Sequence, residues 1–547
     1  MKRLATALFC LLLCLPCVGL GEEFLVSDTG STTAASTGGI PATTDNAILN
    51  AAIDEMNAGS LLDALNSCTK LGTKDGADKY AAYAQALLSL KRDNPASAVD
   101  TLKSIGGFLD SDYQLALAQV LQTHRYPQDA KFGYVDATGA WKIAPAYDWA
   151  ERVFRVESVP AHDVNTATYQ PQDLYMVAKV FSGTTEIGEA DTVPVDGKYG
   201  LLRNDGTLIV PMQYTDILWT VNGVAAVTDG SNAYLYDIAT GKPIGEAFEA
   251  LGPYANGYVT VEKNGLWGYL NPKTAAYLGA GCVWESALPF SEGKAGVSQN
   301  DKYGYIDETG AVVIDLQYTK VNPFSEGLAG VRVQKRWGFI DATGKVIIQP
   351  GYSGLKTFQG GLCAVEKNEV WGLINTTGEV VLRLKYSEIG DFDPIYHRAW
   401  IRQNKLWGLV SNTATLVLKP TWSFHDEFNS NTLCRVSYQK MYGFVDANGK
   451  TRIVSAYLSA SPFRANYAAV KEVSGQIRYL SKAQRSFTIN TTVPVECQCG
   501  FIEGRTITES ERAVTDPTGV AYSVIDRHIA YTLYDEEGNA ITVPVYQ

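Results

Sequence analysis

The sequence predicts a mainly β tandem-repeat array with a small N-terminal α-helical domain. An aromatic–Gly pair followed by large apolar residues recurs along most of the chain at a nearly constant spacing. A polar turn ending in Gly and a second β-branched run follow most of these pairs, which is typical of antiparallel strands. Helical spacing of small and aliphatic residues is found before the array. A fixed period of about 20–50 residues indicates a repeat architecture.

The repeat is defined by the Gly that follows the aromatic residue. The clearest copies stand at Gly268, Gly304, Gly338, Gly372, Gly408 and Gly443, which gives steps of 36, 34, 34, 36 and 35 residues. Gly200 and Gly133 extend the series towards the N-terminus by steps of 68 and 67 residues. The step of 68 residues from Gly200 to Gly268 leaves room for a degenerate copy of the repeat that ends at Gly241. The step of 67 residues from Gly133 to Gly200 is interpreted as one unit with an insertion at about 157–172. About ten units of 34–36 residues are therefore predicted, with atypical ends.

Each unit is predicted to form three antiparallel strands and a loop. Phe339-Ile340 and Val346-Ile347-Ile348 are strand-like runs, and Asp341 to Gly344 between them suits a type I turn that ends in a positive-φ Gly. The Ala-x-Val segment after Pro-Phe-Ser-Glu-Gly, within 323–331, supplies the third strand. The turn glycines predicted by this pattern are Gly310, Gly344, Gly378 and Gly449.

The aromatic–Gly pair is interpreted as structural. Because side chains alternate along a strand, Trp337 and Phe339 share one face and Gly338 lies on the other. A Gly inside a strand indicates a bulge or a close approach by another backbone, so we expect neighbouring units to nest on it. The recurring rings are expected to be mostly buried, with stacking on sugars as the alternative. The tryptophans at this position are Trp267, Trp337, Trp371 and Trp407.

The motif of residues 302–310 and 336–344, followed by Pro-Phe-Ser-Glu-Gly-Leu-Ala, resembles the bacterial WG-repeat (KWG-repeat) proteins. The resemblance covers roughly residues 128–487. It departs at Thr413-Ala414-Thr415, which lacks the turn Gly, and at Arg478, which replaces the last repeat Gly. The resemblance implies a β-rich array of mostly unassigned function. The short units favour propeller-like blades in an open or spiralling array, and a β-solenoid is the alternative.

The N-terminus is interpreted as an export signal followed by a spacer. In residues 1–21, Lys2-Arg3 precede an apolar run, and small residues up to Gly21 mark the cleavage site. Residues 22–44 form a Ser/Thr/Gly-rich linker. We therefore expect an exported bacterial protein, extracellular or in the cell envelope.

The remaining flanks are a helical and a β segment. Residues 45–127 are predicted to be α-helical and resemble tetratricopeptide hairpins, because residues 57–65 align with 91–99 at a step of 34. A generic helical cap on the first β unit is an equal alternative. Residues 488–547 have strand and turn patterns outside the repeat register and are predicted to be a separate C-terminal β segment.

The acidic composition excludes some partners. The formal net charge is −12, and removal of Lys2 and Arg3 with the signal gives −12 − 2 = −14. Nucleic acids and anionic membranes need clustered Lys and Arg, so neither is an expected partner. After signal removal no apolar run is long enough for an integral membrane segment.

No catalytic residue, cofactor or metal is predicted. The five histidines share no motif, and Cys497 and Cys499 lack the two further ligands that zinc needs. Glu292 and Glu326 recur at one position but are interpreted as loop acids. The sequence therefore predicts a non-enzymatic scaffold for protein–protein interaction. A glycan or cell-wall polymer binding module is the alternative, and a cell-envelope hydrolase comes third.

Two segments break the rule of the repeat and are the expected places for a binding site. One is the insertion at 157–172, and the other is the loop 391–397, where Phe-Ser-Glu-Gly is replaced by a longer aromatic and acidic sequence. The partner is expected to be a protein or a cell-envelope polymer.

Overall fold

The computed structural model divides into two compact units. The first contains Asp216–Asp237 and Lys242–Phe358, and the second contains Thr32–Thr215, Ile238–Gly241 and Gln359–Gln547. The predicted signal with Gly21, nearly all of the linker and the insertion at 157–172 lie outside the described residues. No helix in the described part is long and apolar enough to cross a membrane. The structure describes residues 40, 46–57, 59–92, 94–151, 153–155, 176–188, 192–393, 395–428, 433–464, 466–493, 497–498, 501–515, 521–535 and 537–546.

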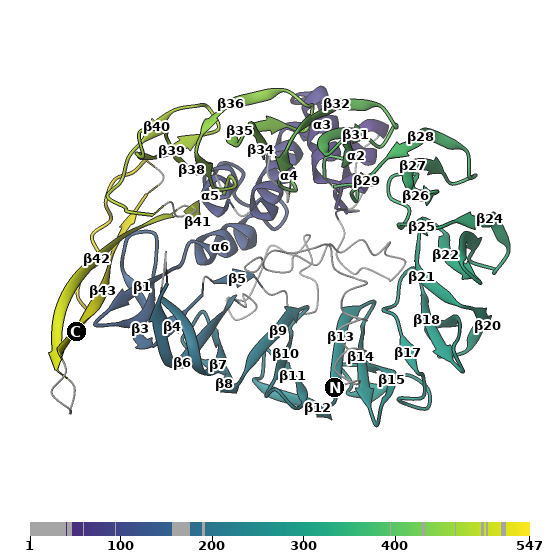
Figure 1. The fold of residues 1–547 in the computed structure, drawn as a ribbon, viewed down its shortest axis with the longest axis horizontal. Helices are drawn as coiled ribbons and strands as arrows, with labels where there is room; N and C mark the ends of the chain where they lie inside the picture. The colour runs from purple at the N-terminus through teal and green to yellow at the C-terminus, as the bar shows by residue number, and fades with distance from the viewer. Residues whose placement is uncertain are drawn as a thin grey trace. The chain divides into compact units, whose positions relative to one another are not determined.

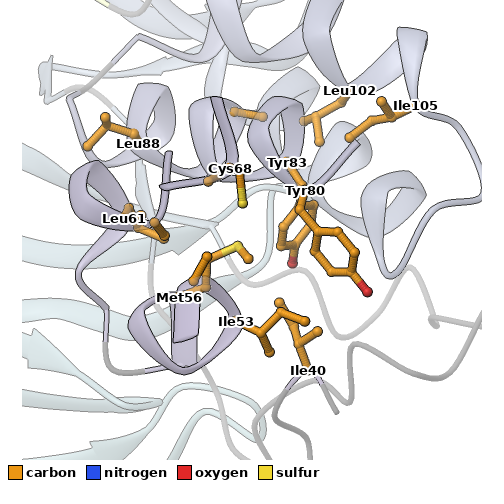
Figure 2. Close-up of a cluster of buried hydrophobic side chains, with 14 of the residues drawn as sticks. Ile40, Ile53, Met56, Leu61, Cys68, Tyr80, Tyr83, Leu88, Leu102 and Ile105 are labelled. Carbon is orange, nitrogen blue, oxygen red and sulfur yellow. The ribbon is translucent and has the colours of Figure 1, made fainter. Parts of the chain in front are cut away.

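The N-terminal part of the second unit is helical. Its described helices are α2 (Ala47–Asn57), α3 (Leu61–Leu71), the 3-10 helix η1 (Lys74–Gly76), α4 (Ala77–Lys91), α5 (Pro95–Ser104) and α6 (Ser111–Leu121). The start of α5 is fixed by Asn94, whose side chain accepts a hydrogen bond from the N–H of Ser97 at 3.2 Å, with Pro95 in the first turn. Figure 2 shows the helical core, in which Met56, Cys68 and Tyr83 are buried together.

The first unit contains four antiparallel four-stranded sheets, each a meander of consecutive strands (Figure 1). The strands are β9 (Asp216–Val221), β10 (Val224–Thr228), β11 (Ala233–Asp237) and β12 (Lys242–Phe248); β13 (Ala250–Ala255), β14 (Tyr258–Lys263), β15 (Leu266–Asn271) and β16 (Ala276–Tyr277); β17 (Ser286–Ala287), β18 (Lys294–Gln299), β19 (Lys302–Asp307) and β20 (Val312–Tyr318); β21 (Lys320–Ser325), β22 (Leu328–Val333), β23 (Arg336–Asp341) and β24 (Val346–Tyr352). The short strand β25 (Gly354–Leu355) follows them.

The second unit continues the same pattern before and after the first unit in sequence. Its early strands are β1 (His124–Gln128), β2 (Lys131–Val135) and β3 (Trp141–Tyr147), then β4 (Trp149–Ala150), β5 (Phe154–Arg155), β6 (Met176–Ile187), β7 (Thr192–Arg203) and β8 (Leu208–Tyr214). Its later strands are β26 (Leu362–Lys367), β27 (Val370–Asn375) and β28 (Val380–Tyr386); β29 (Glu388–Ile389), β30 (Arg398–Gln403), β31 (Leu406–Ser411) and β32 (Leu416–Trp422); β33 (Phe424–His425), β34 (Leu433–Tyr438), β35 (Met441–Asp446) and β36 (Thr451–Tyr457); β37 (Ser459–Ala460), β38 (Tyr467–Lys471), β39 (Ile477–Ser481) and β40 (Ser486–Phe487).

The prediction of three strands per unit is wrong, because the full sheets have four. The missed strand is the segment interpreted as a loop: in β21, Lys320 pairs with Arg332 and Ser325 pairs with Leu328. Pro323 and a register shift between Val321 and Phe324 hide the alternation that would have indicated a strand. The described sheets from β1 to β40 number four in the first unit and six in the second, which gives the ten units predicted. Separate antiparallel meanders define a propeller-like repeat array and exclude the alternative β-solenoid.

The repeat Gly makes room for the fourth strand of its own sheet. A Cβ on Gly338 would lie 2.4 Å from Ile348 O and 2.7 Å from Pro350 N, both in β24. The pairing of β23 with β24 shifts register between Trp337 and Phe339, so β24 bulges over the bare backbone. The expected nesting of neighbouring units on this Gly is therefore wrong. A carbonyl oxygen of the following segment lies 2.4–2.8 Å from the same position at Gly133, Gly200, Gly268, Gly304, Gly372, Gly408 and Gly443.

The last unit shows what happens without this Gly. Arg478 occupies the position in β39, and the fourth strand β40 is only two residues long. β40 pairs with Tyr479 and Leu480 and does not extend over Arg478. A side chain at this position thus coincides with the loss of the bulged fourth strand.

The turns between the third and fourth strands have the predicted form. The Asp341 carboxylate accepts hydrogen bonds from the N–H and O–H of Thr343 (2.9 and 2.6 Å) and from the N–H of Lys345 (3.1 Å). The positive φ is confirmed at each turn Gly: 85° at Gly310, 86° at Gly344, 88° at Gly378 and 76° at Gly449. Where the Gly is lost, Ala414 adopts a φ of 57° and so accepts some strain.

The Pro-Phe-Ser segment links a sheet to both of its neighbours in sequence: its Ser contacts the following sheet and its Phe contacts the preceding one. In the first unit, the Ser325 hydroxyl donates to Phe358 O at 2.7 Å. The Phe339 and Phe358 rings meet edge to face with centroids 4.8 Å apart, and Tyr305 and Phe324 repeat this contact at 4.8 Å one sheet earlier. The motif that identifies the repeat is therefore the contact between its sheets.

The C-terminal segment packs against the first sheet within the second unit. It consists of β41 (Cys497–Gln498) and the long hairpin of β42 (Phe501–Thr515) and β43 (Ala521–Tyr534), drawn in yellow in Figure 1. Trp141 Nε1 donates to Pro544 O at 2.7 Å, and Gln128 Nε2 donates to Tyr546 O at 3.1 Å. These hydrogen bonds link residues near the C-terminus to the start of the array.

A buried ion cluster lies at the same junction. Glu503 is 4% exposed, and its carboxylate lies 3.0 Å from His124 Nε2, 3.5 Å from Arg125 Nε and 2.5 Å from Arg505 Nε. Burial alone would raise the pKa of Glu503, but Arg125 and Arg505 hold it well below its usual range. Glu503 is therefore ionised, and replacing it with a neutral residue would remove the anion that Arg125 and Arg505 share.

Candidate functional site

The tryptophans before the repeat Gly are of intermediate burial, so most of each side chain is covered, as expected, although none of the four is fully buried. Trp337 is the second residue of β23 and lies opposite Tyr352 on β24, near the end of the sheet. The fully covered ring is Phe339, two residues later, because it also meets the neighbouring sheet. Trp371 and Trp407 repeat the position opposite Tyr386 and Trp422, and Trp267 is bridged to Trp284.

Arginine side chains lie over two of these rings. The guanidinium of Arg332 is 6.0 Å from the centroid of Trp337, and that of Arg402 is 5.2 Å from the centroid of Trp407. Such cation–π contacts cover part of a ring face that a sugar would need.

A recurring pair of exposed apolar residues opens the fourth strand of three sheets. The bulge that follows the turn explains it: Ile340 pairs with Val346 and Phe339 with Ile348, so Ile347 falls between the paired positions. Both residues of the pair are therefore exposed, although simple alternation would bury one. The exposed fractions are 45% and 43% for Val312 and Val313, 39% and 38% for Val346 and Ile347, and 53% and 41% for Val380 and Val381.

A cleft of about 470 Å³ lies beside the loop that departs from the repeat, within the second unit. Helix α3 contributes Leu62, Asp63 and Asn66 to its wall. The loop contributes residues 395–398, and the turn between β35 and β36 contributes residues 446–448 with Arg452. The cleft thus brings together segments more than 300 residues apart in the sequence.

Asp393 fixes the shape of the loop. Its N–H donates to Arg398 O at 2.7 Å, its carbonyl accepts from His397 N at 2.9 Å, and its carboxylate accepts from the N–H groups of Ile395 and Tyr396 at 2.9 and 2.7 Å. Burial raises the pKa of Asp393, against the effect of these two N–H donors. The loop is therefore ordered by its own backbone.

The helical region holds the loop from the other side. Ile395 packs against the helical core, and Arg92 Nη2 donates to the Tyr396 hydroxyl at 2.8 Å. The Arg92 guanidinium also lies 5.6 Å from the Tyr396 ring centroid. The replacement of Phe-Ser-Glu-Gly in this unit thus creates a contact with the helices.

One pair of charged groups in the cleft is in close contact, and another is farther apart. Arg452 Nε and Asp446 Oδ2 form a close ion pair at 2.7 Å, and Asp446 also accepts hydrogen bonds from its own turn. The Asp63 carboxylate lies 3.7 Å from His397 Nε2, which is beyond hydrogen-bond distance. Burial lowers the pKa of Arg398. These groups can bind polar or charged ligands.

Sequence reasoning singled out the loop but missed most of the cleft. Residues 391–397 can be recognised in the sequence as a candidate binding segment because they interrupt a recurring motif. Asp63, Asn66 and Arg452 carry no such signal, because their positions in a helix and a strand are ordinary for surface residues. The described residues contain no group of three or more His, Cys, Asp or Glu placed to hold a metal ion. The other marked segment, 157–172, lies outside the described residues.

The comparisons with known proteins agree with this architecture. The WG containing repeat matches at seven positions, so the chain carries WG repeats: residues 132–155, 241–267, 281–303, 303–336, 337–371, 371–407 and 442–472. No curated protein matches the chain in sequence.

Solved structures that match part of the chain include WD40 domains. The Neurospora crassa Pan2 WD40 domain is 13% identical over 42% of this chain and 87% of its own, with a TM-score of 0.23. A eukaryotic initiation factor is 12% identical over 53% of this chain and 92% of its own, with a TM-score of 0.36. PorZ, a bacterial surface component of the type-IX secretion system of Porphyromonas gingivalis, is 9% identical over 76% of this chain, which spans 58% of PorZ, with a TM-score of 0.23. Similarities this low carry no functional argument.

Proposed function

We propose that the chain is a non-enzymatic, exported bacterial scaffold that binds a protein partner through its WG-repeat array. The observation that supports the proposal is the recurring pair of exposed apolar residues at 312–313, 346–347 and 380–381. Core packing accounts for the repeat Gly, the turn Asp and the Phe-Ser contact. It does not require two exposed aliphatic side chains at the same position of three sheets.

The energetics favour a partner at these pairs. Burying a whole Val or Ile side chain contributes about 1.5–3 kcal/mol, so covering the exposed part of each contributes roughly 1 kcal/mol. The two pairs of the first unit, Val312-Val313 and Val346-Ile347, together offer about 4 kcal/mol before the costs of association. Single surface valines are common, but these pairs, called the apolar strip below, recur at one structural position of their sheets.

The experiment is capture of partners from a cell-envelope extract by the purified mature chain, with mass spectrometry of cross-linked proteins. The test variant is Val346→Thr/Ile347→Thr, which preserves branching at Cβ and adds hydroxyl groups. The control is Val454→Thr/Val473→Thr, at two apolar residues that are 69% and 71% exposed but lie outside the pairs. The proposal expects loss of a specific partner with the test variant only. Equal capture by both variants would remove the strip as the binding surface.

Export is tested separately. The proposal expects a mature protein outside the cytoplasm that begins near Glu22, because Lys2-Arg3 and the apolar run precede Gly21. N-terminal sequencing of the fractionated protein measures this directly, and an intact N-terminus in the cytoplasm would contradict it.

Glycan binding is the second candidate, and the recurrence of partly exposed tryptophans favours it. Trp337, Trp371 and Trp407 are of intermediate burial at one structural position. Binding on a glycan array that is lost with Trp371→Leu but retained by the Val346→Thr/Ile347→Thr variant would replace the protein-binding proposal. Turnover of a cell-envelope substrate by the mature chain would overturn the non-enzymatic proposal.

A further inference from the structure

The guanidinium of Arg398 is placed in the cleft by backbone groups alone. Its Nε donates to Ala447 O at 2.8 Å, and its Nη1 donates to the carbonyls of Tyr396 and His397 at 3.0 and 3.1 Å. Carbonyl oxygens orient a cation but do not neutralise it. Within the described part of the chain, no acidic residue forms an ion pair with Arg398. No described residue accepts a hydrogen bond from its Nη2. Partial burial destabilises this charge, as the lowered pKa of Arg398 shows.

A negative charge, that of Asp63, lines the same cleft on its helical side. Asp63 lies on α3, its side chain is 50% exposed, and its carboxylate is 3.7 Å from His397 Nε2. The other acid of the wall, Asp446, is already paired with Arg452 at 2.7 Å. The cleft therefore presents one cation and one anion that have no close ion-pair partner within the described residues.

We propose that this cleft binds a small zwitterion, with a carboxylate on Arg398 and an ammonium group on Asp63. A short peptide with both ends free, or a free amino acid, has this chemistry. The site is independent of the apolar strip and adds a small-molecule function to the scaffold. Asn66 and Asn448, which also line the cleft, supply amide groups for the backbone of such a ligand.

Charge and size argue against other small ligands. A dianion such as phosphate would meet Asp63 and Asp446 as well as Arg398, and a simple cation would meet Arg398. The volume of about 470 Å³ lies in the range of small-molecule sites, which favours a short peptide over a folded partner. The N–H groups of Arg398 Nη2, which no described residue uses, suit a carboxylate in particular, because hydrogen bonds to a charged acceptor are stronger than those to a neutral one.

The experiment is equilibrium dialysis of the purified mature chain at pH 7 against a mixed tripeptide pool with free ends. The same pool is used after N-acetylation and after C-terminal amidation, and a pool of free amino acids forms a fourth arm. The expected result is retention of the free-ended pool and about tenfold weaker retention after either block, the usual effect of losing one charge-assisted hydrogen bond.

Substitution of Asp63 tests whether the ammonium group of the ligand binds at this residue. Asp63→Asn should weaken retention of the free-ended pool about tenfold and leave the N-acetylated pool unchanged, because the same interaction is then already absent. The control is Asp54→Asn, an exposed Asp on α2 that does not line the cleft. Equal retention of the blocked and free-ended pools would overturn the proposal, as would no retention of any pool. Retention of free amino acids as strong as that of tripeptides would support the zwitterion and identify the ligand as an amino acid.

Discussion

Replacing the repeat Gly by Ala at position 338 should weaken one sheet without changing the rest of the chain. The added Cβ would lie 2.4 Å from Ile348 O, 2.7 Å from Pro350 N and 2.9 Å from the carbonyl carbon of Gln349. All three atoms belong to the backbone of β24, so no side-chain rotation relieves the contact. The strand itself must move away by several tenths of an ångström or more.

The magnitude follows from what this movement breaks. Displacing β24 weakens about two ladder hydrogen bonds at about 1 kcal/mol each and adds the strain of overpacking, about 1–3 kcal/mol. We therefore expect Gly338→Ala to lower the local free energy of unfolding by about 2–4 kcal/mol. The matched control is Gly351→Ala in the same sheet, where the nearest atom to the new Cβ is Gln349 O at 3.7 Å.

Native-state hydrogen exchange is the assay, because repeat arrays need not unfold in one step and a global midpoint would average over the sheets. The amides of β23 and β24 should lose protection in Gly338→Ala and retain it in Gly351→Ala. Equal protection in both variants would refute the conclusion that the Gly exists to admit the bulged fourth strand.

Three further predictions concern the turn, the contact between sheets and the C-terminal junction. Gly344→Val should cost at least about 1–2 kcal/mol of local stability because its φ is 86°, whereas Gly351→Val should cost less; hydrogen exchange measures both, and equal effects would contradict the turn assignment. Ser325→Ala should cost about 1 kcal/mol in chemical denaturation, because it leaves Phe358 O without its hydroxyl donor, and no change would show that water replaces the donor. Because the pKa of Glu503 is depressed, its stabilising contribution is present above about pH 4.3, the usual value for an unfolded Glu, and is lost as the pH falls through the folded value. Glu503→Gln should remove this acid dependence from thermal unfolding and lower stability at pH 7 by about 3–5 kcal/mol, and an unchanged pH profile would contradict the role of the carboxylate.

The features that could be predicted from sequence are those set by local conformation. The period, the ten units and the positive φ of the turn glycines all follow from residues within a few positions of one another. Asp341 and Gly344 illustrate this, because their turn is closed entirely by hydrogen bonds within its own residues.

The features that could not be predicted depend on bulges and on long-range contacts. The register shift next to Phe339 exposes Ile347. The register shift in β21 interrupts the alternation of side chains, so the sequence of this strand is typical of a loop. Trp337 is mostly covered, as expected, but the part of its surface that stays exposed near the start of β23 is not revealed by spacing. The cleft depends on the contact of Tyr396 with Arg92, more than 300 residues away in the sequence.

The proposed function is tested most directly by hydrogen–deuterium exchange of the mature chain with and without its captured partner. The proposal predicts new protection concentrated at the starts of the fourth strands, around Val312-Val313, Val346-Ile347 and Val380-Val381. Protection elsewhere, with these amides unchanged, would contradict the conclusion that the exposed apolar pairs form the binding surface of the array.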